Sequence, residues 1–147
     1  MLKSKVLVML VIASTALVAA CEDEGPDDEE YTATLNGASE VPANNSTATG
    51  SARFVVNANR TISYNLTVSG LTPTQQHIHG PITTPTGTAS PIVDLAIGTN
   101  LTLTETSFNR GVSYDSALVL LRNNRTYVNV HTAAIPAGEI RGNLIRQ

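Results

Sequence analysis

The stretch RTISYNLTVSG, residues 60–70, decides the fold of this chain. Its apolar residues fall on every second position, at Ile62, Tyr64, Leu66 and Val68. A β-strand turns successive side chains to opposite faces, so this period of two places one set against a core and the other toward water. The stretch therefore predicts a half-buried strand.

Segments on both sides of this strand extend the pattern. GSARFVVN, residues 50–57, is predicted to be its partner, with 57–60 as the hairpin turn, because Asn tolerates the left-handed backbone of tight turns. Thr, Val, Ile, Asn and Gly dominate this part of the chain, and turn residues recur at short intervals. Further candidate strands lie at 31–37, 77–80, 90–98, 101–108, 126–132 and 139–145.

One segment, SYDSALVLLRNN at 113–124, breaks the strand pattern. Ser113 or Asp115 can cap a helix, and the apolar residues that follow share one helical face. We therefore expect an all-β domain, an antiparallel immunoglobulin-like sandwich or barrel with one short helix packed over an end.

The first 20 residues have the features of a secretion signal. Lys3 and Lys5 precede an apolar run, and small residues close it at Ala19 and Ala20. The apolar run is shorter than the roughly 20 residues that cross a bilayer. Residues 1–20 are therefore predicted to be a signal peptide.

Cys21 follows these small residues directly, as in the bacterial lipobox, where the cysteine thiol is acylated. It is the only cysteine in the chain, so no intramolecular disulfide can form. Lipidation explains both its position and its isolation. We therefore predict that Cys21 anchors the protein to a membrane.

An acidic segment, EDEGPDDEE, comes next and holds seven acids in nine residues. Such a block repels itself and cannot bury apolar surface, which predicts that 21–30 is a lipidated, disordered acidic tether before a domain at 31–147. The segment also resembles the acidic signal that sends some lipoproteins to the cell surface. In other lineages an acid directly after the cysteine favours retention at the inner membrane; of these cell-envelope locations we expect the outer membrane or cell surface.

The composition of the domain limits its chemistry. From Tyr31 onward five acids face seven arginines, which is too weak and scattered an excess for nucleic-acid binding. Beyond Cys21 there is no Lys, Met or further Cys, so Schiff-base lysines, thiolate nucleophiles and soft Cu⁺ ligands are excluded. This favours a non-enzymatic binding or structural role, with an envelope or extracellular protein or polymer as partner.

Three stretches carry a family resemblance: LNGASEVPANNSTATGSARFVV at 35–56, HIHGP at 77–81 and YVNVHTAAIPAGEIRG at 127–142. In this order they resemble the opening, middle and closing motifs of the CHRD domain, named after chordin. The resemblance implies an immunoglobulin-like sandwich and carries no established activity. The segment 81–91 departs from the family's shorter Gly-rich turn, and we expect a flexible loop there where a ligand could enter.

The three histidines are the candidate site. His77 and His79 share a strand face, and His131 shares one with Tyr127 and Asn129, while the intervening valines should take the core. The face of His131 is therefore expected to look toward solvent or a cleft. If residues 77–80 lie beside 126–132, the three imidazoles converge.

Three interpretations of this cluster remain open. It can be a hydrogen-bonded polar cluster in which Glu139 and Arg141 pair with His131, which is the interpretation we favour. Alternatively, His77, His79 and His131 bind Cu or Zn, with redox or hydrolytic activity as an extension. General acid/base catalysis is the third interpretation. No catalytic residue and no definite cofactor follow from the sequence.

Overall fold

The computed structural model describes residues 29–147. The predicted signal peptide, Cys21 and the tether up to residue 28 lie outside these described residues. The described part consists of nine strands, two short 3₁₀ helices and one α-helix. In chain order they are β1 (Glu29–Asn36), η1 (Gly37–Ser39), β2 (Thr49–Val56), β3 (Ile62–Ser69), β4 (Pro73–His79), β5 (Pro91–Asp94), β6 (Gly98–Leu103), η2 (Glu105–Ser107), α1 (Tyr114–Arg122), β7 (Tyr127–Thr132), β8 (Ile140–Asn143) and β9 (Ile145–Arg146).

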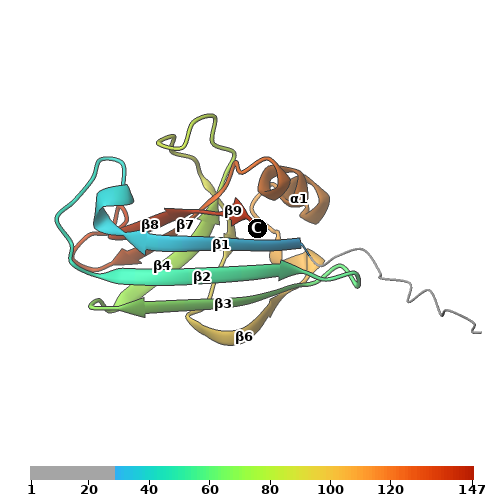
Figure 1. Ribbon diagram of the computed structural model, residues 1–147, viewed down its shortest axis with the longest axis horizontal. Coiled ribbons are helices and arrows are strands. Elements are labelled where there is room, and N and C mark those ends of the chain that lie inside the picture. Colours follow the sequence, from blue (N-terminus) through green and yellow to red (C-terminus); the bar gives the residue numbers. More distant parts are fainter. Residues whose placement is uncertain (1–28) are drawn as a thin grey trace, which may run out of the picture.

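All nine strands belong to one antiparallel sheet that curls into a half-barrel around a single core (Figure 1). The order across the sheet is β5-β4-β7-β8-β1-β2-β3-β6, and β9 pairs with β1. The predicted all-β class with one short helix is confirmed. The strands form one continuous curled sheet, so the structure corresponds to the barrel form of the expectation.

The strand predicted from 60–70 is β3, and its alternation is confirmed. Ile62, Tyr64 and Leu66 are buried on the core side, and Tyr64 stacks on Phe54 of β2 with 5.2 Å between ring centroids. The turn between β2 and β3 also occurs where it was expected. The residue in the left-handed region is Arg60, with φ of 63°, rather than one of the asparagines.

The first strand begins two residues earlier than the sequence suggested. Glu29 and Glu30 were assigned to the tether, but the structure places both in β1. Glu29 accepts hydrogen bonds from Arg122, and Glu30 accepts a bidentate pair from Arg53. Arginines of the domain attract these two carboxylates, and a count of acidic residues alone cannot detect such distant partners.

Helix α1 forms at the predicted place, with Ser113 as its N-cap accepting from the Ser116 amide at 3.3 Å. Ala117, Leu118 and Leu121 face the core, so the helix covers one end of the half-barrel. Within residues 29–147, no helix has both the length and the apolar character that a membrane crossing needs.

The strand register gives the domain two distinct ends. Residues 37–48, 70–72 and 133–138 connect strands at one end, which we call the loop end, because Asn36 pairs with Thr49 and Pro73 pairs with Thr132. The start of β1 and the β2–β3 turn lie at the opposite end (Figure 1). The chain before residue 29 therefore joins the domain away from the loop end.

Candidate functional site

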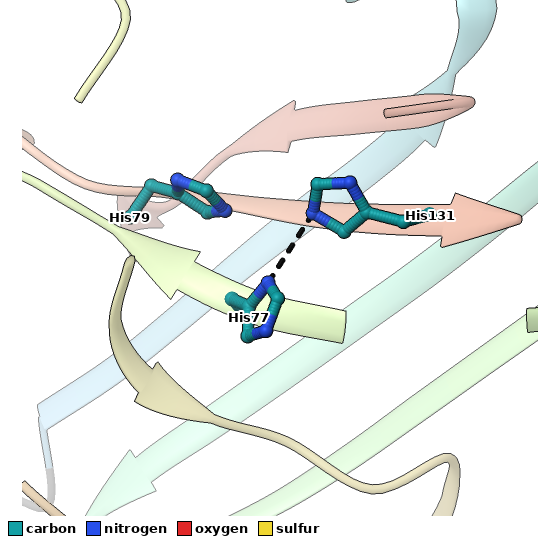
Figure 2. A group of neighbouring side chains, drawn as sticks. All are labelled: His77, His79 and His131. Carbon is teal, nitrogen blue, oxygen red and sulfur yellow. Dashed lines mark hydrogen bonds between the residues drawn. The ribbon is translucent and has the colours of Figure 1, made fainter. Parts of the chain in front are cut away.

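The three histidines come together because β4 and β7 are antiparallel neighbours. The register sets His77 opposite Asn129, His79 opposite Tyr127 and Gln75 opposite His131. All three imidazoles leave the sheet on the side away from the core, and their rings turn toward one another (Figure 2). The expected convergence of the HIHG and NVHT segments is thus confirmed.

The histidine face is covered, which corrects the expectation that it looks toward solvent, although a hollow of about 200 Å³ beside Asp94 and Arg110 reaches His77. His77 and His79 are each 7% exposed and His131 is 9% exposed. Residues 81–90 and 133–138 lie over the outer face of β4, β7 and β8, where their carbonyls accept hydrogen bonds from its side chains. The valines of β7 do face the core, so every residue of this strand is buried, from one side or the other.

The segment between β4 and β5 forms part of this cover. Tyr127 and Ala89 exchange hydrogen bonds at 3.2 Å, and Asn143 donates to the Pro85 carbonyl at 2.9 Å. The expected entry loop at 81–91 is therefore tied to the outer face of the sheet. Its backbone carbonyls serve as acceptors for the polar side chains beneath it.

Arg141 and Glu139 have other partners than His131, contrary to the favoured interpretation. Arg141 is 1% exposed, lies 3.6 Å from the Tyr127 ring centroid and donates to the Gly87 carbonyl at 2.7 Å. Glu139 accepts from Ser46 and Thr132. Gly87 and Ser46 belong to loops far along the chain, and strand alternation does not reveal such partners.

Two further residues frame the cluster and were missed by the sequence analysis. Tyr127 stacks on His79 with 4.8 Å between centroids and 16° between planes. Asp94 of β5 lies with Oδ1 3.2 Å from His77 Nε2 and is itself held by Arg110. Tyr127 shares the alternation of His131 and could have been included. Asp94 had no such pattern, since it reaches His77 only through the β4–β5 pairing.

Burial keeps two of the imidazoles neutral at pH 7. Loss of water around the ring lowers the pKa of His77, and the neighbouring His131 adds to this effect. Burial also lowers the pKa of His79 to about 4, although the hydrogen bond to the Ala89 carbonyl opposes the shift. These rings therefore offer lone pairs rather than positive charges at neutral pH.

A second polar group lies next to the cluster on the same side of the sheet. Glu40 and Asn129 are 8% and 4% exposed, and Glu40 Oε1 and Asn129 Oδ1 have no hydrogen-bond partner among residues 29–147. Burial raises the pKa of Glu40 to about 6. A Cβ atom on Gly138 would lie 2.5 Å from Asn129 Nδ2 and 2.8 Å from Glu40 Oε1, so only glycine fits there.

The fold and this site define a class: an all-β half-barrel module with a loop-covered polar face that holds three imidazoles. Residues 31–144 match the family model of the CHRD domain, so the chain belongs to the CHRD domain family, as its motifs indicated. Membership supports a non-enzymatic module at the level of the family. No curated protein and no solved structure matches the chain.

Proposed function

We propose that this CHRD module is a lipid-anchored binding protein of the cell envelope. Cys21 carries the lipid, and the acidic segment after it joins the anchor to β1. One acyl chain gives only marginal attachment, so the proposal includes the two or more chains that make an anchor stable. The outer membrane or cell surface is the proposed location.

The observation that carries the proposal is the position of the two ends of the domain. The chain enters at Glu29, and the loop end lies across the length of the sheet from this point (Figure 1). An anchor at Cys21 would thus hold the loop end away from the membrane. A hollow of about 410 Å³ opens there between residues 70–72 and the start of the β7–β8 connection at Thr132.

The partner is proposed to be a protein or polymer of the envelope or the surroundings of the cell. Loops at one end of a rigid sheet commonly carry binding residues, because the sheet fixes their positions. The loop end includes exposed Ala133 and Ala134, which place apolar atoms beside backbone polar groups. No large charge excess on the domain points to nucleic acid.

Cys21→Ser tests the anchor. In cells that make the protein, the wild-type chain should incorporate a palmitate analogue and sediment with membranes, whereas the Cys21→Ser chain should do neither. A wild-type chain that does not label would overturn the proposal.

Crosslinking tests which end meets the partner. A photo-crosslinking residue at Ala134, on the loop end, should give a specific adduct in intact cells. Ala58 is the matched control, because it is an exposed alanine in the turn at the opposite end. Adducts from Ala58 alone would contradict the proposed orientation.

A further inference from the structure

The strongest unassigned feature is the arrangement of the nitrogen atoms in His77, His79 and His131. One ring nitrogen from each residue lies within 4.8 Å of the other two. The closest pair, His77 Nδ1 and His131 Nε2, is separated by 3.2 Å (Figure 2). These atoms come from two neighbouring strands of a rigid sheet, and loops cover them.

The other nitrogen of each ring faces an atom that can only accept a hydrogen bond. His79 Nδ1 lies 2.8 Å from the Ala89 carbonyl, and His131 Nδ1 lies 3.0 Å from the Pro136 carbonyl. His77 Nε2 lies 3.2 Å from the Asp94 carboxylate. His79 Nδ1 and His131 Nδ1 must therefore carry the proton, and the carboxylate of Asp94 favours the tautomer of His77 with its proton on Nε2.

In a neutral imidazole the remaining nitrogen then holds a lone pair. Those nitrogens are His77 Nδ1, His79 Nε2 and His131 Nε2. The buried His79 Nε2 has no hydrogen-bond partner among residues 29–147, and a buried acceptor of this kind is costly to leave unpaired. In one tautomer of His77, Nδ1 donates to His131 Nε2; with the proton on Nε2, beside Asp94, the 3.2 Å pair instead brings two lone pairs face to face. Such an arrangement is stabilised by a cation placed between the rings.

We infer that His77 Nδ1, His79 Nε2 and His131 Nε2 bind one divalent transition-metal ion, with Cu²⁺ preferred over Zn²⁺. For Zn²⁺, metal–nitrogen bonds of about 2.0–2.1 Å in tetrahedral geometry put ligand nitrogens about 3.4 Å apart. The closest pair, 3.2 Å apart, already has about this spacing, and because all three nitrogens lie within 4.8 Å of one another the third needs to approach by at most about 1.4 Å. Three protein ligands leave a fourth position for water or a small ligand.

The ligand chemistry selects the ion. Imidazole nitrogen suits Cu²⁺ and Zn²⁺, whereas Mg²⁺ and Ca²⁺ require oxygen ligands. Residues 29–147 contain no cysteine and no methionine, so the described chain offers no soft sulfur ligand for Cu⁺. For a given nitrogen site, Cu²⁺ binds more tightly than Zn²⁺ in the usual order of divalent metals.

Asp94 acts as a positioning residue in this site. Metal-binding histidines commonly donate their outer N–H to a carboxylate or a backbone carbonyl, which fixes the ring and its tautomer. All three rings have such an acceptor, and only His77 has a carboxylate. Arg110 holds Asp94 with hydrogen bonds of 2.7 Å to Oδ1 and 3.2 Å to Oδ2. Because Asp94 is half-exposed, it can be changed without disturbing the core.

The test is a titration of the purified full chain with Cu²⁺, Zn²⁺ and Mg²⁺ by calorimetry. Cys21→Ser is present throughout, since a free thiol would compete for Cu²⁺. We expect one Cu²⁺ per chain, weaker binding of one Zn²⁺, and no binding of Mg²⁺. His77→Ala, His79→Ala and His131→Ala should each weaken Cu²⁺ binding by about 100-fold or more. Gln75→Ala, at an exposed residue of the same strand, is the matched control and should bind normally.

Asp94→Asn keeps the proposal testable if a histidine variant does not fold. It should weaken Cu²⁺ binding by about 10- to 100-fold, as for other outer hydrogen-bond partners of metal ligands. The melting temperature of the metal-free protein should not change. In the intact chain, ¹⁵N NMR during Zn²⁺ titration should shift Nδ1 of His77 and Nε2 of the other two histidines.

Three results would overturn the inference. The first is the absence of saturable one-to-one binding. The second is Cu²⁺ affinity that survives all three histidine substitutions and is lost when 22–28 is deleted, which would place the ion on the acidic segment. The third is shifts at the opposite ring nitrogens. The inference does not depend on the lipid anchor, so either proposal can fail without the other.

Discussion

The two halves of the sheet, β2–β3 and β4–β7–β8, have the same strand alternation but differ in what lies over the face opposite the core. In β2 and β3, one face is core and the other meets water, where Ser51 and Thr67 share a hydrogen bond at the surface. In β7, the residues that correspond to this outer face are Tyr127, Asn129 and His131, and all are buried. The difference between the halves is the cover of loops over β4, β7 and β8.

The comparison shows that strand alternation determines which residues share a face and leaves the environment of that face undecided. An outer face in water needs no partners, because water supplies them. A covered polar face must find its hydrogen bonds in the protein, since a buried polar group without one costs roughly 1–3 kcal/mol. Loop carbonyls at Pro85, Gly87, Ala89 and Pro136 supply these bonds.

Replacing an arginine should give the largest difference in stability between the two halves. Arg141→Ala removes a buried guanidinium from the Tyr127 ring, leaves the Gly87 carbonyl without its side-chain donor and leaves the Pro85 carbonyl with Asn143 alone. We expect the free energy of unfolding to fall by roughly 3–5 kcal/mol in urea denaturation.

Arg53→Ala is the matched change in the open half, where Arg53 pairs with Glu30 at the surface. Its unfolding midpoint should stay within experimental error of the wild type, because exposed ion pairs contribute little. Equal losses at Arg53 and Arg141 would break the comparison.

Glycine substitutions should give the next largest loss of stability. Gly138→Ala places a Cβ against Asn129 and Glu40 at a backbone φ of 134°, so we expect a loss of about 3 kcal/mol in unfolding free energy. Gly111→Ala also has a positive φ, 80°, but its Cβ would meet nothing within 4 Å. This control should lose only about 1 kcal/mol from backbone strain. Similar losses in both variants would show that the side chains of Asn129 and Glu40 can move aside for the added Cβ atom.

The smallest effect is a pair of opposite pH dependences. Burial raises the pKa of Glu40 to about 6, above its ordinary 4.5. The neutral carboxyl is therefore favoured in the folded state, and stability should fall by about 1–2 kcal/mol as pH rises from 4.5 through 6. The hydrogen bond from Arg122 lowers the pKa of Glu29 to about 2, so its contribution is present above pH 4.5 and is lost as pH falls toward 2.

Urea unfolding of the wild type, Glu40→Gln and Glu29→Gln across this pH range separates the two carboxyls. Glu40→Gln should remove the fall between pH 4.5 and 6 and be more stable than the wild type at pH 7. Glu29→Gln should be less stable at pH 7 and approach the wild type only as pH falls toward 2. A Glu40→Gln profile that parallels the wild type would mean that this carboxyl is hydrated.

Local sequence patterns were sufficient to predict the local elements. The alternation of Ile62, Tyr64 and Leu66 predicted β3, and Ser113 with the apolar face after it predicted α1, because each depends on backbone geometry over a few residues. They also predicted that His77 and His79 share a face. The family followed from the motifs, and the match over 31–144 confirms it.

Only the tertiary structure decided what surrounds the histidines. His131 reaches His77 across 54 residues of chain, and Asp94 reaches it through the pairing of β4 with β5. The carbonyls of Ala89 and Pro136 belong to loops, and every residue carries a carbonyl, so no sequence pattern marks them. Strand order and loop packing result from the whole fold. The sequence therefore showed which three histidines were candidates, but it did not show which nitrogen of each ring faces the other two rings.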